Sequence, residues 1–172
     1  SSAAEALAKF KLDPATAVSL FELLASQDEY PLYSNAIPVI SHLGAEAVPI
    51  VVKALQLRED DGTLEFFAFE FLDQLGPAAV SGLVELSKTD PWKERVIPLL
   101  GKPRSAEAVP HLIDLLKHET RQRRAEAAEA LGRLGEIAAP AIPALSPQLT
   151  DHDIKVTVRA IEALGRIGRR SA

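Results

Sequence analysis

The residue types of this 172-residue chain that could bind a metal are its histidines and carboxylates, and their spacing argues against such a site. The chain has four histidines: His42, His111, His118 and His152. No two of them stand four residues apart, and the H-E-x-x-H pattern of zinc hydrolases does not occur in the sequence. His118-Glu119 is a single His-Glu step. The sequence therefore predicts no metal ligands.

Nucleophilic chemistry has equally little support in the sequence. The chain has no cysteine, which removes disulfides, thiolate metal sites and a Cys nucleophile together. It has no G-x-S-x-G turn and no glycine-rich phosphate loop. The adjacent carboxylates Asp60 and Asp61 belong to the polar stretch "REDDGT", which is typical of a solvated turn. We therefore predict no catalytic residue and no cofactor.

Arginines are the remaining candidates, and they concentrate toward the C-terminus. Residues 1–100 carry 7 basic and 15 acidic residues, a net charge of −8, whereas residues 101–172 carry 12 and 9, a net charge of +3. A basic patch favours nucleic acid, but Glu126, Glu129 and Glu162 interrupt it, and the acidic half would repel phosphate. Glu129 and Glu162 each precede an arginine by four residues, Arg133 and Arg166, a spacing that pairs charges on one helix. The sequence thus favours a self-paired basic face.

A repeat supplies the elements that position these residues. "EALGRLG" begins at Glu129 and "EALGRIG" at Glu162, 33 residues later, and Leu-Gly or Ile-Gly pairs also end at Gly44, Gly76 and Gly101. A period near 33 indicates stacked helical repeats. Before each glycine the pattern predicts a first helix. In the last unit Val156, Ala160, Ala163, Leu164 and Ile167 form its apolar stripe, and its final glycine suits the left-handed position that closes a helix.

After each glycine the sequence predicts a second helix, with Pro49, Pro110 and Pro140 near the helix starts, where a missing N–H costs little. The first unit is degenerate, with Asp13 at the glycine position, and the unit before Gly101 is about two turns short and contains Pro98. We therefore expect a change of curvature or a kink at that unit.

These patterns resemble the short HEAT-type repeats of bacterial proteins, including those of the phycobilin-lyase kind. The likeness is carried by "DHDIKVTVRAIEALGRIG" and by the "AAPAIPAL" helix, and it is strongest over residues 119–168. It implies an all-α fold, a right-handed α-solenoid of stacked antiparallel helix pairs. The family's bracing arginine, early in the first helix, is matched here by Arg124 alone. We expect one domain, residues 1–172, with approximate repeats at 1–27, 28–57, 58–88, 89–118, 119–150 and 151–172.

The resemblance also implies that the first helix of each pair lines a concave binding face. Independently, Phe66 falls opposite the apolar stripe of its helix, whereas Phe69 and Phe71 are predicted to be core. The candidate binding residues on this face are His42, Phe66, Phe67, Glu70, Gln74, Trp92, Arg95, Leu99, Glu129, Arg133, Arg159, Glu162 and Arg166.

The function we predict from the sequence is a non-catalytic scaffold, a monomer, that binds a protein or peptide through the concave face. One alternative, by resemblance, is a subunit of a phycobilin-type chromophore lyase or isomerase; a second is a HEAT-like nucleic-acid-binding protein. With no signal peptide in view and no apolar run of about 18 residues, we expect a cytoplasmic location and no membrane partner.

Overall fold

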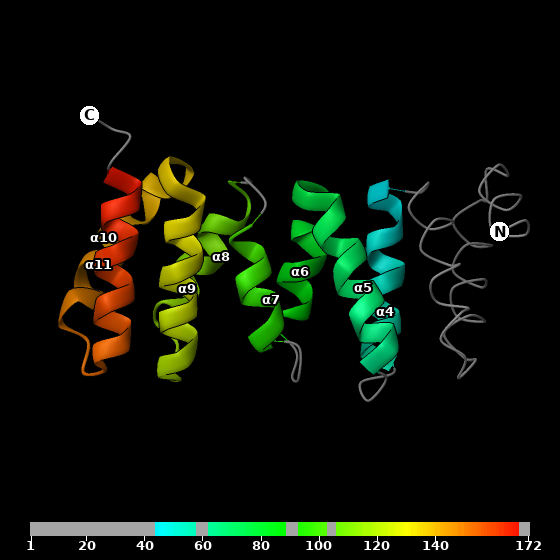
Figure 1. Ribbon diagram of the computed structural model, residues 1–172, viewed down its shortest axis with the longest axis horizontal. Helices are drawn as coiled ribbons and strands as arrows, with labels where there is room; N and C mark the ends of the chain where they lie inside the picture. The colour runs from blue at the N-terminus through cyan, green and yellow to red at the C-terminus, as the bar shows by residue number, and fades with distance from the viewer. Residues whose placement is uncertain (1–43, 58–61, 89–92, 103–105, 169–172) are drawn as a thin grey trace, which may run out of the picture. The chain divides into compact units, whose positions relative to one another are not determined.

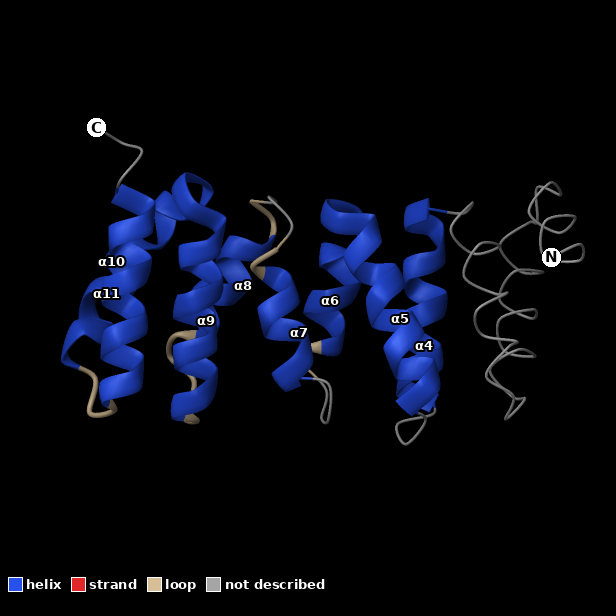
Figure 2. Cartoon of the chain, viewed as in Figure 1, coloured by secondary structure: helices blue, strands red, loops and turns tan. Residues whose placement is uncertain are grey.

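The regular elements of the chain are helical wherever the structure describes it. The computed structural model describes residues 44–57, 62–88, 93–102 and 106–168, and within these ranges every element is an α-helix or a 3-10 helix (Figures 1 and 2). This confirms the predicted all-α class. The predicted repeat 1–27 and the first helix before Gly44 lie outside the described residues. None of the described helices is both long and apolar enough to cross a membrane.

The chain divides into two compact units, residues 1–82 and 83–172, and each is described by itself. The prediction that the six repeats of the chain form one domain stays a prediction. In the first unit, Val51, Leu55, Phe71 and Leu72 are almost fully buried and form the core. The described elements of this unit are the 3-10 helix η1 (Gly44–Ala47), α4 (Val48–Leu57), α5 (Gly62–Leu75), η2 (Gly76–Ala79) and the start of α6 (Val80–Leu86).

In the second unit, successive first helices pack side by side: α7 lies against α9, and α9 lies against α11 (Figure 1). The second helices form the other layer, with α8 and η3 against α9, and η3, α10 and η4 against α11. Its elements after α6 are α7 (Lys93–Leu100), α8 (Ala108–Leu115), α9 (Arg121–Leu134), η3 (Gly135–Ala141), α10 (Ile142–Leu145), η4 (Ser146–Thr150) and α11 (Ile154–Gly168).

The repeated glycines serve two different purposes. Gly44, Gly76 and Gly135 have φ values of 53°, 55° and 60°, so they occupy the left-handed position that turns one helix into the next. Gly168 has no positive φ and is the last described residue of α11, so the left-handed position predicted for it is wrong. Gly101 also lacks a positive φ. It is needed for space, since a Cβ built on it would lie 2.7 Å from the Cα of Ala130.

The first glycine of the "EALGRLG" copy, Gly132, brings two repeats into close contact. A Cβ built on Gly132 would lie 2.9 Å from the Cα of Ala163, so the backbones of α9 and α11 approach too closely for any side chain at this position. The predicted stripe of α11 faces this contact: Val156, Ala160, Ala163 and Ile167 are buried, while Leu164 is half-buried. The repetition in the sequence therefore encodes a packing interface.

Prolines shape the second helices. Pro49 and Pro110 stand near the starts of α4 and α8, as predicted, but Pro140 lies inside η3. With Pro143 and Pro147 following, the helix predicted after Gly135 is divided into η3, a four-residue α10 and η4. Proline removes a backbone donor and favours a break at such spacing. The described first helix before Gly101, α7, has 8 residues, against 14 in α9, and contains Pro98. Residues 89–92, directly before it, lie outside the described residues, so the predicted shortening stays a prediction.

Arg124 braces two repeats, as the resemblance implied. Its guanidinium donates to both carboxylate oxygens of Asp151, at 2.7 and 2.9 Å, and also to the carbonyls of His118 and Glu119. One side chain therefore ties the start of α9 to the turn before it and to the link before α11. The side chains of Arg124 and Asp151 are only 18% and 10% exposed. The hydrogen bond from Arg124 lowers the pKa of Asp151.

Candidate functional site

Charged side chains from α9 and α11 form a network on the face made by the first helices. Arg133 donates to Glu129 at 2.7 Å, which confirms the predicted spacing of four residues within α9. Arg159 of α11 reaches across to the other oxygen of Glu129, at 3.3 Å, and also donates to Glu162 at 3.0 Å. We call this surface, formed by Glu129, Arg133, Arg159, Glu162 and Arg166, the charged face.

One predicted pair of the charged face is replaced. The sequence paired Glu162 with Arg166, but Glu162 accepts from Arg159 instead. The physical reason is that Arg159 stands between two carboxylates, Glu129 on one helix and Glu162 on its own, and its forked guanidinium serves both. The side chain of Arg166 remains exposed at the end of α11.

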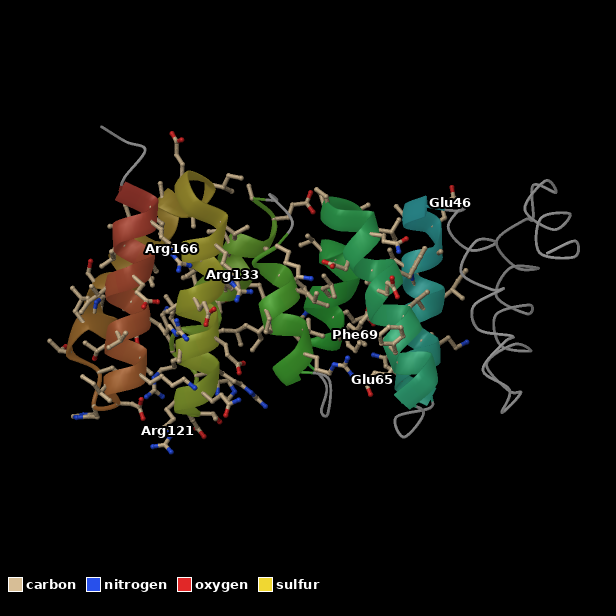
Figure 3. All side chains as sticks on the ribbon, in the orientation of Figure 1. Glu46, Glu65, Phe69, Arg121, Arg133 and Arg166 are labelled. Atoms are coloured by element: carbon tan, nitrogen blue, oxygen red, sulfur yellow. The ribbon has the colours of Figure 1, made fainter. Side chains whose placement is uncertain are left out.

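Beside Arg166 the surface is hollowed. A hollow of about 490 Å³ is lined by Arg166 from α11 and by residues 132–137, which include Arg133, the acidic Glu136 and the turn at Gly135. Figure 3 shows where Arg133 and Arg166 lie on α9 and α11. Five charges with three arginines and two glutamates leave this face with one excess positive charge. Guanidinium groups bind carboxylates through paired hydrogen bonds, so the hollow suits an acidic group.

The other candidate residues lie on earlier helices or outside the described part of the chain. On α5, Phe66 is 54% exposed, and Glu70 and Gln74 are also exposed, whereas Phe69 and Phe71 are buried, as predicted (Figure 3 labels Phe69). On α7, Arg95 is exposed and Leu99 is half-buried. His42 and Trp92 lie outside the described residues, and so does the side chain of Phe67.

A serine and a histidine meet in the second unit, which the sequence analysis missed. The hydroxyl oxygen of Ser87 lies 2.6 Å from Nε2 of His111. The residues are 24 positions apart, and no local pattern links them. Ser87 is 5% exposed, and its hydroxyl donates to the carbonyl of Val84 at 2.7 Å. Because its single hydrogen is used there, His111 must donate from Nε2, so it does not act as a base toward Ser87.

The environment of His111 agrees with a neutral ring. Burial lowers the pKa of His111, and the nearby Lys88 lowers it further, while Asp114 opposes both. A neutral imidazole with its hydrogen on Nε2 satisfies the buried oxygen of Ser87. The pair therefore links the turn after α6 to α8 rather than presenting a nucleophile to solvent.

Comparison with known proteins supports the repeat architecture. A family model of HEAT repeats matches residues 92–165, the part of the chain from the start of α7 into α11. A search of curated proteins finds no match.

Three solved structures, each the crystal structure of an engineered protein, are similar to nearly the whole chain. The first has a TM-score of 0.51 and 23% identity and covers 98% of this chain and 91% of its own. The other two have TM-scores of 0.50 and 21% identity; both cover 97% of this chain, and 80% and 48% of their own. The fold is an α-solenoid. Residues 92–165 are similar to HEAT repeats, and the predicted bacterial, phycobilin-lyase kind remains a prediction.

Proposed function

We propose that the chain is a non-catalytic scaffold that binds a protein or peptide segment on its charged face. The observation that carries this proposal is the charged network itself. Ion pairs join Glu129, Arg133, Arg159 and Glu162 between α9 and α11, and Arg133 and Arg166 line one hollow beside them. Ion pairs that hold each other in place present their donors in a fixed geometry, which favours specific recognition over simple charge attraction.

The chemistry of the face selects the kind of segment. Glu129 and Glu162 are already occupied by arginines, so the group with donors left over is Arg166, with Arg133 beside it at the hollow. A partner segment with an acidic side chain or a terminal carboxylate fits this position. Polar or mixed-charge residues on either side of that group would meet the Glu129–Arg159–Glu162 pairs.

The test is a selection from a random peptide library displayed on phage, with the full chain immobilised. We expect enrichment of peptides that contain Asp or Glu, and loss of this enrichment in the Arg133→Ala/Arg166→Ala double variant. Lys117→Ala is the control, because Lys117 is an exposed cation that follows α8 in the other layer. Enrichment that is equal in the double variant, or absent for the unmodified chain, contradicts the proposal.

Basic residues of the second unit favour this reading over nucleic-acid binding. Arg121, Arg124, Arg133 and Arg159 each bond a carboxylate within the chain. Such pairing neutralises the positive charges that a phosphate backbone requires. The chromophore-lyase alternative rests on the family resemblance alone.

A further inference from the structure

Exposed apolar side chains gather at the C-terminal helix pair. Among the described residues, six large hydrophobic side chains are exposed, and five of them belong to η3–η4 and α11, the exception being Phe66 of α5. We call these five the end surface: Ile142, Leu149, Ile154, Val158 and Ile161. Ile154 is 75% exposed and Ile161 57%. Scattered single hydrophobics are ordinary on a surface, whereas a group like this marks a contact.

The 33-residue period shows what kind of contact the end surface makes. The residues that precede Val158, Ile161 and Gly165 by one period are Ala125, Ala128 and Gly132, which are buried on the side of α9 that faces α11. Likewise Val109 and Leu116, one period before Ile142 and Leu149, are buried. The end surface therefore occupies positions that are buried one period earlier in the chain.

Gly132 and Gly165 occupy the same position in two successive repeats, but only Gly132 is covered by a neighbouring helix. A Cβ on Gly132 would meet the backbone of Ala163, but a Cβ on Gly165 would have nothing within 4 Å. The outer side of α11 thus has a glycine at the same position as the side of α9 that packs against α11.

The end surface nevertheless differs from a standard repeat contact. Arg121 and Arg124, which bond Asp153 and Asp151 of the following repeat, are replaced one period later by Ile154 and Thr157. Ala125 and Ala128 are replaced by the larger Val158 and Ile161, which would hold a neighbouring helix farther away. These replacements favour a second copy of the chain over a further repeat of the same kind.

The outer side of α11 is complementary to itself. Ile154, Val158, Ile161 and Gly165 stand at spacings of four, three and four residues, which gives one straight apolar stripe opposite the buried face. Placed antiparallel about a two-fold axis, this stripe sets Val158 against Ile161 of the other copy. It also sets Ile154 over the open space at Gly165.

Charges on one flank of the stripe agree with that arrangement. Lys155 and Glu162 each follow a stripe residue by one position, and both are exposed. In an antiparallel pair these positions face each other, so Lys155 of each copy meets Oε1 of Glu162 of the other, while Arg159 keeps its bond to Oε2. A two-fold interface repeats every such contact, giving two attractive pairs.

We propose that the end surface is a homodimer interface in which α11 of two copies packs antiparallel across a two-fold axis. This interface is additional to the proposed peptide binding. It departs from the monomer predicted from the sequence, because the exposure of these side chains is known only from the structure. Ile142 and Leu149 lie at the margin of the contact, and Arg166 lies outside the stripe.

The first test is sedimentation velocity of the full chain over a range of concentrations. We expect reversible dimerisation, and a weakening of about tenfold or more in Ile161→Glu, since two copies of the substituted side chain are buried in the centre of the interface. Phe66→Glu is the matched control, because it places the same charge at an exposed hydrophobic residue outside the end surface. Circular dichroism establishes that both variants are folded. A chain that stays monomeric, or a dimer insensitive to Ile161→Glu, overturns the proposal.

A second test addresses the antiparallel arrangement. Lys155→Glu and Glu162→Lys should each weaken the dimer, because each places like charges opposite one another, and the two substitutions combined should restore it. Failure of the combined variant to recover dimerisation overturns the antiparallel pairing even if Ile161→Glu behaves as expected.

Discussion

At the scale of single residues, the side chains that tie segments together matter more for stability than the number of ion pairs. Arg124 and Arg121 both bond an aspartate of the next repeat, but their surroundings differ. Arg124 is 18% exposed and holds two carboxylate oxygens and two carbonyls. Arg121 is 76% exposed and makes a contact of 3.2 Å with Asp153. Burial and the number of bonds per guanidinium set the contribution.

Arg124→Ala is therefore expected to lower the free energy of unfolding by about 3 kcal/mol, because Asp151 loses its partner while remaining mostly buried. Arg121→Ala, the matched control, should change it by about 0.5 kcal/mol or less. Denaturant unfolding followed by circular dichroism measures both. Similar losses of unfolding free energy in the two variants would show that the Arg124–Asp151 pair contributes no more than a surface ion pair.

His111 predicts how stability depends on pH. Because burial lowers the pKa of His111 in the folded state, the unfolded chain binds more protons once the pH falls below the ordinary histidine pKa of about 6.5. The stabilisation associated with the neutral ring is present above that pH and is lost as the pH falls below it. Unfolding experiments at a series of pH values should show this decline. His111→Gln should reduce it. An unchanged decline in His111→Gln counts against this origin.

At the scale of elements, the equivalent glycine of the two heptapeptide copies lies in two different environments. Gly132 is buried against the backbone of Ala163, and Gly165 is exposed with open space around it. Both lie inside helices, where glycine costs about 1 kcal/mol relative to alanine. The same substitution should therefore have opposite effects in α9 and α11.

Gly132→Ala is expected to destabilise the chain by about 1–3 kcal/mol, since α9 and α11 must separate to admit the methyl group. In the monomeric chain, Gly165→Ala should raise the free energy of unfolding by up to about 1 kcal/mol through helix propensity. Thermal unfolding of the two variants side by side is sufficient. Destabilisation by Gly165→Ala comparable to that by Gly132→Ala would mean that both copies make the same contact.

The sequence predicted the elements better than their contacts, for a physical reason. Periodicity and turn residues act locally, so the alternation of first and second helices and the left-handed Gly44, Gly76 and Gly135 could be predicted. Contacts between repeats depend on what lies opposite. The close approach at Gly101, the partner of Arg159 across the interface and the Ser87–His111 bond all join residues far apart in the sequence. The handedness of the solenoid stays a prediction.

At the scale of the whole molecule, charge distribution bears on the choice of partner. The net charge is −5, with the first 100 residues at −8 and the remainder at +3. A nucleic-acid-binding solenoid would need a continuous row of unpaired cations. In the described part of the second unit, Arg133 and Arg159 instead share Glu129, and Arg159 also bonds Glu162. Opening these pairs to release cations for phosphate would cost the contacts that order the charged face.

We therefore expect the chain to bind duplex DNA or RNA no more tightly than a non-specific protein does, with a Kd of about 1 μM or weaker at physiological salt. Fluorescence anisotropy with a labelled duplex, repeated at low and high salt, measures this directly. The Glu129→Gln/Glu162→Gln double variant is an informative comparison. It frees Arg133 and Arg159 from their carboxylates and should strengthen binding at low salt, because affinity for phosphate follows the number of available cations. Tight, salt-sensitive binding by the unmodified chain would show that its arginines exchange their internal partners for phosphate, and it would favour the nucleic-acid alternative over peptide recognition.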